Sequence, residues 1–209
     1  IKAAAGSPRV HPGEPMKNAA EICSVIDQAQ ALKADVLVLP ELVLSGYTAA
    51  DLFLRAPLLE GVLTALECIK DHLGRPEYEG LIVVLGAPIR ADGRLFNCAV
   101  FLQNGRVLGI VPKSHLPNYQ EFYEARWFSP ASEAVSSTAE LLGDTVPFGT
   151  DLIFESASGL AIAAEICEDL WVAQPPAAAA AAAGANVIVN LSASNETAGK
   201  AKFRRELVR

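Results

Sequence analysis

The sequence contains 209 residues, of which 51% are hydrophobic and 20% are charged, with a formal net charge of −7. This composition is typical of a globular domain, and the length fits a single domain with a sizeable core. The negative charge argues against a general nucleic-acid binder. Because no apolar run approaches the roughly 18 to 20 residues of a membrane span, we expect no membrane segment.

Strand and helix patterns alternate through the first half of the chain. Apolar residues recur at helical spacing over residues 15–33 and 58–73, and Gly74 and Pro76 end the second pattern. Near-continuous apolar runs predict buried strands over residues 1–5, 35–40 and 81–87. The alternation predicts an α/β domain built in layers.

The second half begins with a hairpin signature. Strand patterns over residues 95–102 and 106–111 are joined by Asn104-Gly105, a strong signal for a tight turn. The polar and aromatic residues 112–130 predict a long functional loop. We further expect a strand hairpin (150–154 and 160–166, turning at 156–159), a helix containing seven alanines (175–185), a strand (186–191) and a basic helical tail from residue 199.

The four cysteines are Cys23, Cys68, Cys98 and Cys167, and no two of them form a CxxC pair. We therefore expect no metal site and a reduced, cytoplasmic protein without an N-terminal signal peptide. Cys23, Cys68 and Cys98 lie within helical or strand patterns and are interpreted as packing residues. Cys167 differs, because carboxylates follow it directly.

Three apolar strands end in side chains that carry chemistry. Glu41 follows one strand, Lys113 follows a second and Cys167 follows a third. A thiol that is largely un-ionised at neutral pH needs a base or a positive field, which a carboxylate and an ammonium group supply. Each residue alone has an ordinary explanation: a buried packing cysteine, a capping glutamate and a solvated lysine. Together they favour a catalytic site.

The Glu41–Lys113–Cys167 pattern resembles that of the nitrilase superfamily of carbon–nitrogen hydrolases. One branch is especially similar, the glutaminase domain of glutamine-dependent NAD synthetases. The segments that carry the resemblance are LPELVLSGYTAADLF (39–53), KSHLPNYQEFYEARWF (113–128), EICEDLW (165–171) and NLSASN (190–195).

The resemblance implies a nitrilase-type α-β-β-α sandwich in which residues 1–209 form one carbon–nitrogen hydrolase domain. It also implies that the domain lacks its C-terminal part and that the synthetase domain is absent, since the sequence contains no Ser-Gly-Gly-x-Asp phosphate loop. The glutaminase reaction would need no cofactor, whereas ATP and Mg²⁺ would act only in the synthetase domain. The implied partners are L-glutamine, that synthetase domain and further copies of the chain.

In this reading Cys167 is the nucleophile that forms a γ-glutamyl thioester. Glu41 is the general base, and Lys113 stabilises the oxyanion. The resemblance also suggests a second glutamate that orients the lysine. Glu121 fits that place, although an exposed loop charge explains it equally well.

Four further residues are expected to bind the substrate. The resemblance implies Tyr119 and Glu168 as contacts for glutamine, with Ser194 near the α-amino or α-carboxylate group. Tyr47, six residues after Glu41, is expected to line the same pocket. Each has a simpler alternative in packing, turn formation or capping. Two other functions remain open: a nitrilase-type enzyme acting on another amide or carbamoyl group, and a non-catalytic assembly subunit.

Overall fold

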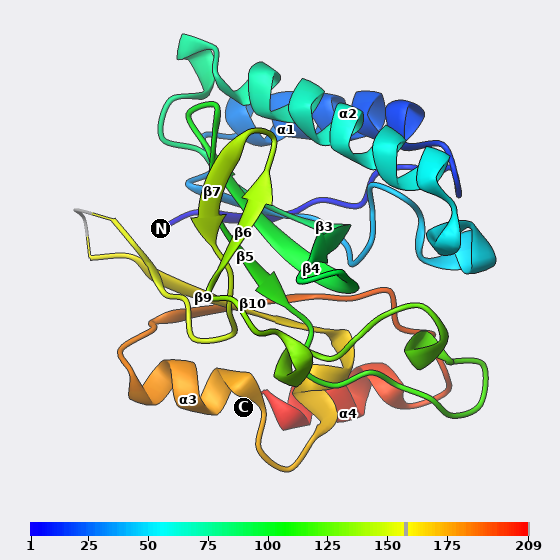
Figure 1. Cartoon of the computed structure of the whole chain (residues 1–209). Coiled ribbons are helices and arrows are strands. Elements are labelled where there is room, and N and C mark those ends of the chain that lie inside the picture. Colours follow the sequence, from blue (N-terminus) through cyan, green and yellow to red (C-terminus); the bar gives the residue numbers. More distant parts are fainter. Residues whose placement is uncertain (157–158, 209) are drawn as a thin grey trace.

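The computed structural model describes residues 1–156 and 159–208 and arranges them in four layers (Figure 1). Helices α1 (Pro15–Ala31) and α2 (Ala56–Leu73) form one outer layer, and α3 (Pro176–Ala182) and α4 (Lys200–Leu207) lie on the opposite side. Two sheets lie between these helices. The α-β-β-α sandwich expected from the sequence is therefore confirmed.

The first sheet has five strands in the order β1-β2-β3-β4-β5. The first three strands are parallel, whereas β3, β4 and β5 form an antiparallel meander. The β4–β5 turn contains Asn104 (φ 50°) and Gly105 (φ 70°), the two positive angles that a tight hairpin turn requires. The strand bounds are Ala3–Ala5, Val36–Val38, Ile82–Ala91, Arg94–Gln103 and Arg106–Pro112.

The second sheet has the order β10-β9-β8. Strand β9 (Ala161–Ile166) is parallel to β10 (Val187–Leu191) and antiparallel to β8 (Phe154–Glu155). Strand β8 is shorter and later than the strand predicted over residues 150–154, and the predicted turn residues 157 and 158 lie outside the described residues. The two-stranded ribbon of β6 (Thr138–Leu141) and β7 (Asp144–Pro147) was not expected from the sequence.

Two apolar cores hold the layers together. One fills the space between the first sheet and the helices α1 and α2, and it includes the fully buried Ile22 and Ile26 of α1. The other lies between the two sheets. There the rings of Phe101 and Phe154 stack with their centroids 3.8 Å apart. Burying a phenylalanine side chain stabilises a fold by about 1.5–3 kcal/mol, so the second core holds the two sheets against each other.

The described part of the chain contains five short 3₁₀ helices that were not predicted, and three of them shape the loops around the strand ends. These three are η1 (Tyr47–Leu54), η3 (Glu124–Arg126) and η5 (Cys167–Trp171). The other two are η2 (Pro76–Tyr78) and η4 (Ala131–Glu133). Such short helices carry little periodic signal in a sequence, because they are too short for a repeating apolar face.

The interpretation of the three structural cysteines needs one correction. Cys98 is fully buried and Cys23 is half-buried, but Cys68 is exposed on α2. An apolar helix pattern fixes the buried face only approximately, so a small residue at its margin can point to solvent. Among the described residues, no helix is both long and apolar enough to cross a bilayer.

Candidate active site

Both sheets contribute to one buried polar site at the ends of their strands. Glu41 follows β2, Lys113 follows β5 and Cys167 follows β9. All three side chains are nearly inaccessible, with relative exposures of 2%, 0% and 6% respectively. The structure thus brings together the three residues that the sequence analysis singled out.

Lys113 is held by two carboxylates. Its Nζ lies 2.6 Å from Glu41 Oε1, and it lies 2.7 and 2.9 Å from the two oxygens of Glu124. Burial alone would lower the pKa of Lys113, but the charges of Glu41 and Glu124 outweigh it and raise that pKa above its ordinary value. Lys113 is therefore a fixed positive charge with no exposure to solvent.

Glu124, and not Glu121, is the second carboxylate on the lysine. Glu121 is exposed, and its carboxylate accepts a hydrogen bond from the side chain of Asn195. The polypeptide turns inward only three residues later, where η3 begins and Phe128 is buried against Phe53. The prediction that Glu121 orients Lys113 is therefore wrong, because the path of the loop determines which glutamate reaches the strand end.

Glu124 is supported by an aromatic hydroxyl. Tyr47 donates a hydrogen bond of 2.7 Å from its hydroxyl to Glu124 Oε1. Burial and the neighbouring charge of Glu41 raise the pKa of Glu124, whereas Lys113 opposes that rise. Tyr47, predicted to bind substrate, lies at the site as expected, but its hydroxyl is used to hold Glu124.

Glu41 is held through both of its oxygens. Oε1 accepts a bond of 2.7 Å from Asn97 Nδ2 in addition to the lysine, and Oε2 accepts a bond of 3.0 Å from the backbone N–H of Ala193. Asn97 is fully buried on β4, and its Oδ1 has no hydrogen-bond partner among the described residues. Asn97 was not predicted as a site residue, although one polar residue inside an otherwise apolar strand pattern was a usable signal.

Cys167 sits at the turn from β9 into η5. Its φ of 48° is in the left-handed region, which non-glycine residues seldom adopt, and such strain is common where a nucleophile is presented. Ser192 donates from Oγ to Cys167 Sγ over 3.4 Å. Burial, together with the charge of Glu41, raises the pKa of the Cys167 thiol to about 12, while Lys113 opposes the rise. The resting thiol is therefore protonated and needs a base.

The other predicted substrate residues are linked to the turn that presents Cys167, and Ser194 N–H donates to Ser192 Oγ. The Tyr119 hydroxyl lies 3.0 and 3.1 Å from the carboxylate oxygens of Glu168, the residue after the nucleophile. Burial and the bond to Glu168 raise the pKa of Tyr119. Ser194 Oγ accepts a bond of 2.5 Å from Lys200 Nζ, which also lies 5.5 Å above the ring of Trp171. Lys200 was not predicted as a site residue, because only the fold of the tail places it there.

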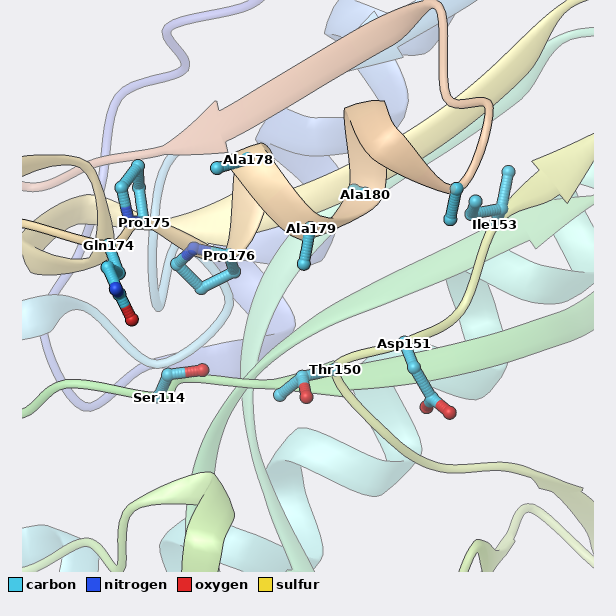
Figure 2. Close-up of a pocket in the computed structure, with 11 residues that line it drawn as sticks. Ser114, Thr150, Asp151, Ile153, Gln174, Pro175, Pro176, Ala178, Ala179 and Ala180 are labelled. Atoms are coloured by element: carbon cyan, nitrogen blue, oxygen red, sulfur yellow. The ribbon is translucent and has the colours of Figure 1, made fainter.

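Two cavities lie near the strand ends. One, of about 410 Å³, is bounded by Trp171, Ser192 and Ser194 and so adjoins the nucleophile. The other, of about 720 Å³, opens between α3 and the segment around Thr150 and Asp151 (Figure 2). The lining of neither cavity includes Glu41, Lys113 or Cys167. Because Ser192, which lines the first cavity, bonds to Cys167 Sγ, the first cavity is the better candidate for substrate entry. Across the described residues, no group of three or more His, Cys, Asp or Glu side chains is placed to hold a metal ion.

Comparisons with known proteins agree with this geometry. The chain is 44% identical over 202 residues to the glutamine-dependent NAD(+) synthetase of Mycobacterium tuberculosis, covering 94% of this chain and 29% of that protein. The corresponding protein of Mycobacterium leprae is 41% identical over 213 residues, covering 100% of this chain and 30% of the relative. This chain thus spans less than a third of the length of these relatives.

Solved structures agree as well. A glutamine-dependent NAD(+) synthetase from Cytophaga hutchinsonii superposes with a TM-score of 0.83 at 30% identity, covering all of this chain and 33% of that one. An amidase from Nesterenkonia sp. superposes with a TM-score of 0.72 over 96% of this chain and 68% of its own; at 19% identity it supports the fold alone. The family model of carbon-nitrogen hydrolases matches residues 2–208. The chain therefore belongs to the carbon–nitrogen hydrolase family.

Proposed function

We propose that this domain hydrolyses the side-chain amide of L-glutamine and releases ammonia. The observation that carries the proposal is the single buried site in which Cys167 lies beside a carboxylate, Glu41, and a lysine, Lys113. A thiol, a base and a fixed cation are the parts that amide hydrolysis through a covalent intermediate requires.

The reaction begins with a proton transfer. Glu41 accepts the Cys167 proton as sulfur attacks the amide carbon, and Lys113 stabilises the negative charge that develops on the carbonyl oxygen. The C–N bond then breaks, Glu41 returns the proton to the leaving nitrogen, and ammonia departs from a γ-glutamyl thioester. Water, deprotonated by Glu41, cleaves the thioester to glutamate and restores the thiol.

Charged groups near the nucleophile turn suit the free ends of an α-amino acid. Glu168, held by the Tyr119 hydroxyl, offers a negative partner for an α-ammonium group. Lys200, whose Nζ lies 2.5 Å from Ser194 Oγ, offers a positive partner for an α-carboxylate. We infer that Glu168 and Lys200 together select free glutamine over amides without charged ends.

The released ammonia would serve a second reaction. The similar proteins are named glutamine-dependent NAD(+) synthetases, and this chain spans less than a third of them. We propose that a synthetase domain, using ATP and Mg²⁺, consumes the ammonia to amidate deamido-NAD. The glutaminase reaction itself would need no cofactor, and a cytoplasmic homo-oligomer is the expected setting.

The test is covalent labelling with a glutamine-mimicking diazo-ketone, followed by mass mapping with and without excess L-glutamine. We expect one adduct on Cys167, protected by glutamine and absent from Cys167→Ala. Labelling by iodoacetamide but not by the diazo-ketone would refute glutamine as the substrate and favour another amide. Failure of both reagents to reach Cys167 would favour the non-catalytic alternative.

A further inference from the structure

A buried carboxylate joins the segment after Lys113 to the turn that presents Cys167. Asp169 is 1% exposed. Its Oδ1 accepts a 2.7 Å bond from the backbone N–H of His115, and its Oδ2 accepts bonds of 3.0 Å from Ile166 N–H and 3.3 Å from Ser114 N–H. One side chain thus binds the residue before the nucleophile and the two residues after the lysine.

Helix capping accounts for only part of this arrangement. Asp169 is the third residue of η5 and reaches back to the N–H of Ile166, as a capping carboxylate does. The bonds from Ser114 and His115 have no place in a cap, because these residues lie more than 50 positions earlier and at the end of a strand in the other sheet. Burial raises the pKa of Asp169. Because a buried carboxylate loses its hydration, the three N–H donors are needed to stabilise its charge.

We propose that Asp169 is a positioning residue that sets the placement of Lys113 relative to Cys167. Lys113 and Cys167 leave different sheets, so the packing between the sheets fixes their separation only coarsely. The Asp169 carboxylate fixes this separation more closely, because backbone N–H groups at both strand ends donate to its two oxygens. It also fixes the backbone next to Cys167, where φ is 48° and the turn is strained.

The consequence is catalytic. A displacement of about 1 Å in a reacting group can reduce a rate by about 10²-fold. Asp169→Asn keeps the shape of the side chain but replaces one acceptor oxygen with an N–H₂ group that faces backbone donors. We expect kcat for amide hydrolysis to fall by about 10²-fold while KM changes less than about threefold, because the proposed substrate contacts Tyr119 and Glu168 keep their side chains.

The inference rests on the proposed chemistry at Cys167 but not on glutamine as the substrate. Its test is therefore a double-mutant cycle with iodoacetamide, which alkylates the thiol whatever the natural amide is. If Asp169 acts through Lys113, Asp169→Asn slows alkylation of Cys167 about tenfold in the otherwise native protein and less than about threefold in a Lys113→Met background. Removing a negative charge without moving the lysine would instead speed alkylation.

Two variants complete the test. Asp144→Asn changes an exposed carboxylate of the β6–β7 ribbon and should leave both rates unchanged. Asp169→Glu keeps the charge and the acceptor oxygens on a longer side chain, and it should lower kcat by less than Asp169→Asn does. This variant tests the proposal if Asp169→Asn does not fold. An equal alkylation effect in both backgrounds, or lost stability with unchanged kcat, would overturn the proposal.

Discussion

Replacing Glu124 by glutamine tests the central feature of the site, the lysine shared between two carboxylates. The substitution keeps the size of the side chain and one carbonyl oxygen, and it removes one negative charge from a buried cluster. Lys113 then keeps its 2.6 Å contact with Glu41 and loses a charged partner at 2.7 and 2.9 Å. The ammonium group is expected to shift toward Glu41 and away from the oxyanion.

The size of the effect follows from these contacts. A hydrogen bond to a charged group contributes about 1.5–3 kcal/mol. In Glu124→Gln the remaining oxygen still accepts one bond from Lys113, whereas the N–H₂ group cannot accept the other, so about 1.5–3 kcal/mol is lost. If this loss appears in the transition state, at about 1.4 kcal/mol per tenfold, kcat falls by roughly 10- to 150-fold.

The assay is steady-state release of ammonia from glutamine, with Glu121→Gln as the matched control. Glu121 is three residues away and exposed, and within the described part of the chain it forms no hydrogen bond or ion pair with Lys113. We expect its variant to keep kcat within about threefold of the original. A larger loss in Glu121→Gln than in Glu124→Gln would refute the assignment of the second glutamate.

Three further predictions concern neighbouring parts of the site. Gly86→Ala should reduce kcat by more than about 10²-fold, because a Cβ at Gly86 would lie 2.2 Å from the backbone nitrogen of Leu42, beside Glu41. The control is Gly61→Ala on α2, where the new Cβ has ordinary contacts. Equal kinetics for the two variants would contradict the prediction. Tyr119→Phe should raise KM for glutamine by about two- to tenfold with kcat nearly unchanged, since only the bond to Glu168 is lost; a fall in kcat alone would show another role. Because burial raises the Cys167 pKa to about 12, iodoacetamide alkylation should keep accelerating as pH rises, and a plateau below about pH 9 would show that the resting thiol is already ionised.

Local patterns in the sequence were sufficient for much of the fold. The apolar face of α1, the Asn104-Gly105 turn and the buried strands follow from periodicity and turn chemistry, which depend on neighbouring residues. The three strand ends with Glu41, Lys113 and Cys167 were visible for the same reason. The resemblance of the four motifs added the layer order, which periodicity alone does not give.

Tertiary structure decided the contacts between distant segments. The loop after Lys113 contains both Glu121 and Glu124, and nothing in their spacing indicates which one turns inward; the burial of Phe128 and the turn of η3 select Glu124. Asn97 and the N–H of Ala193 reach Glu41 from 56 and 152 residues away. Hydrogen bonds over such separations depend on how the two sheets pack, and a one-dimensional pattern does not contain that packing. The sequence by itself therefore determined which chemical groups this protein has at its strand ends, whereas only the fold decided which of them touch.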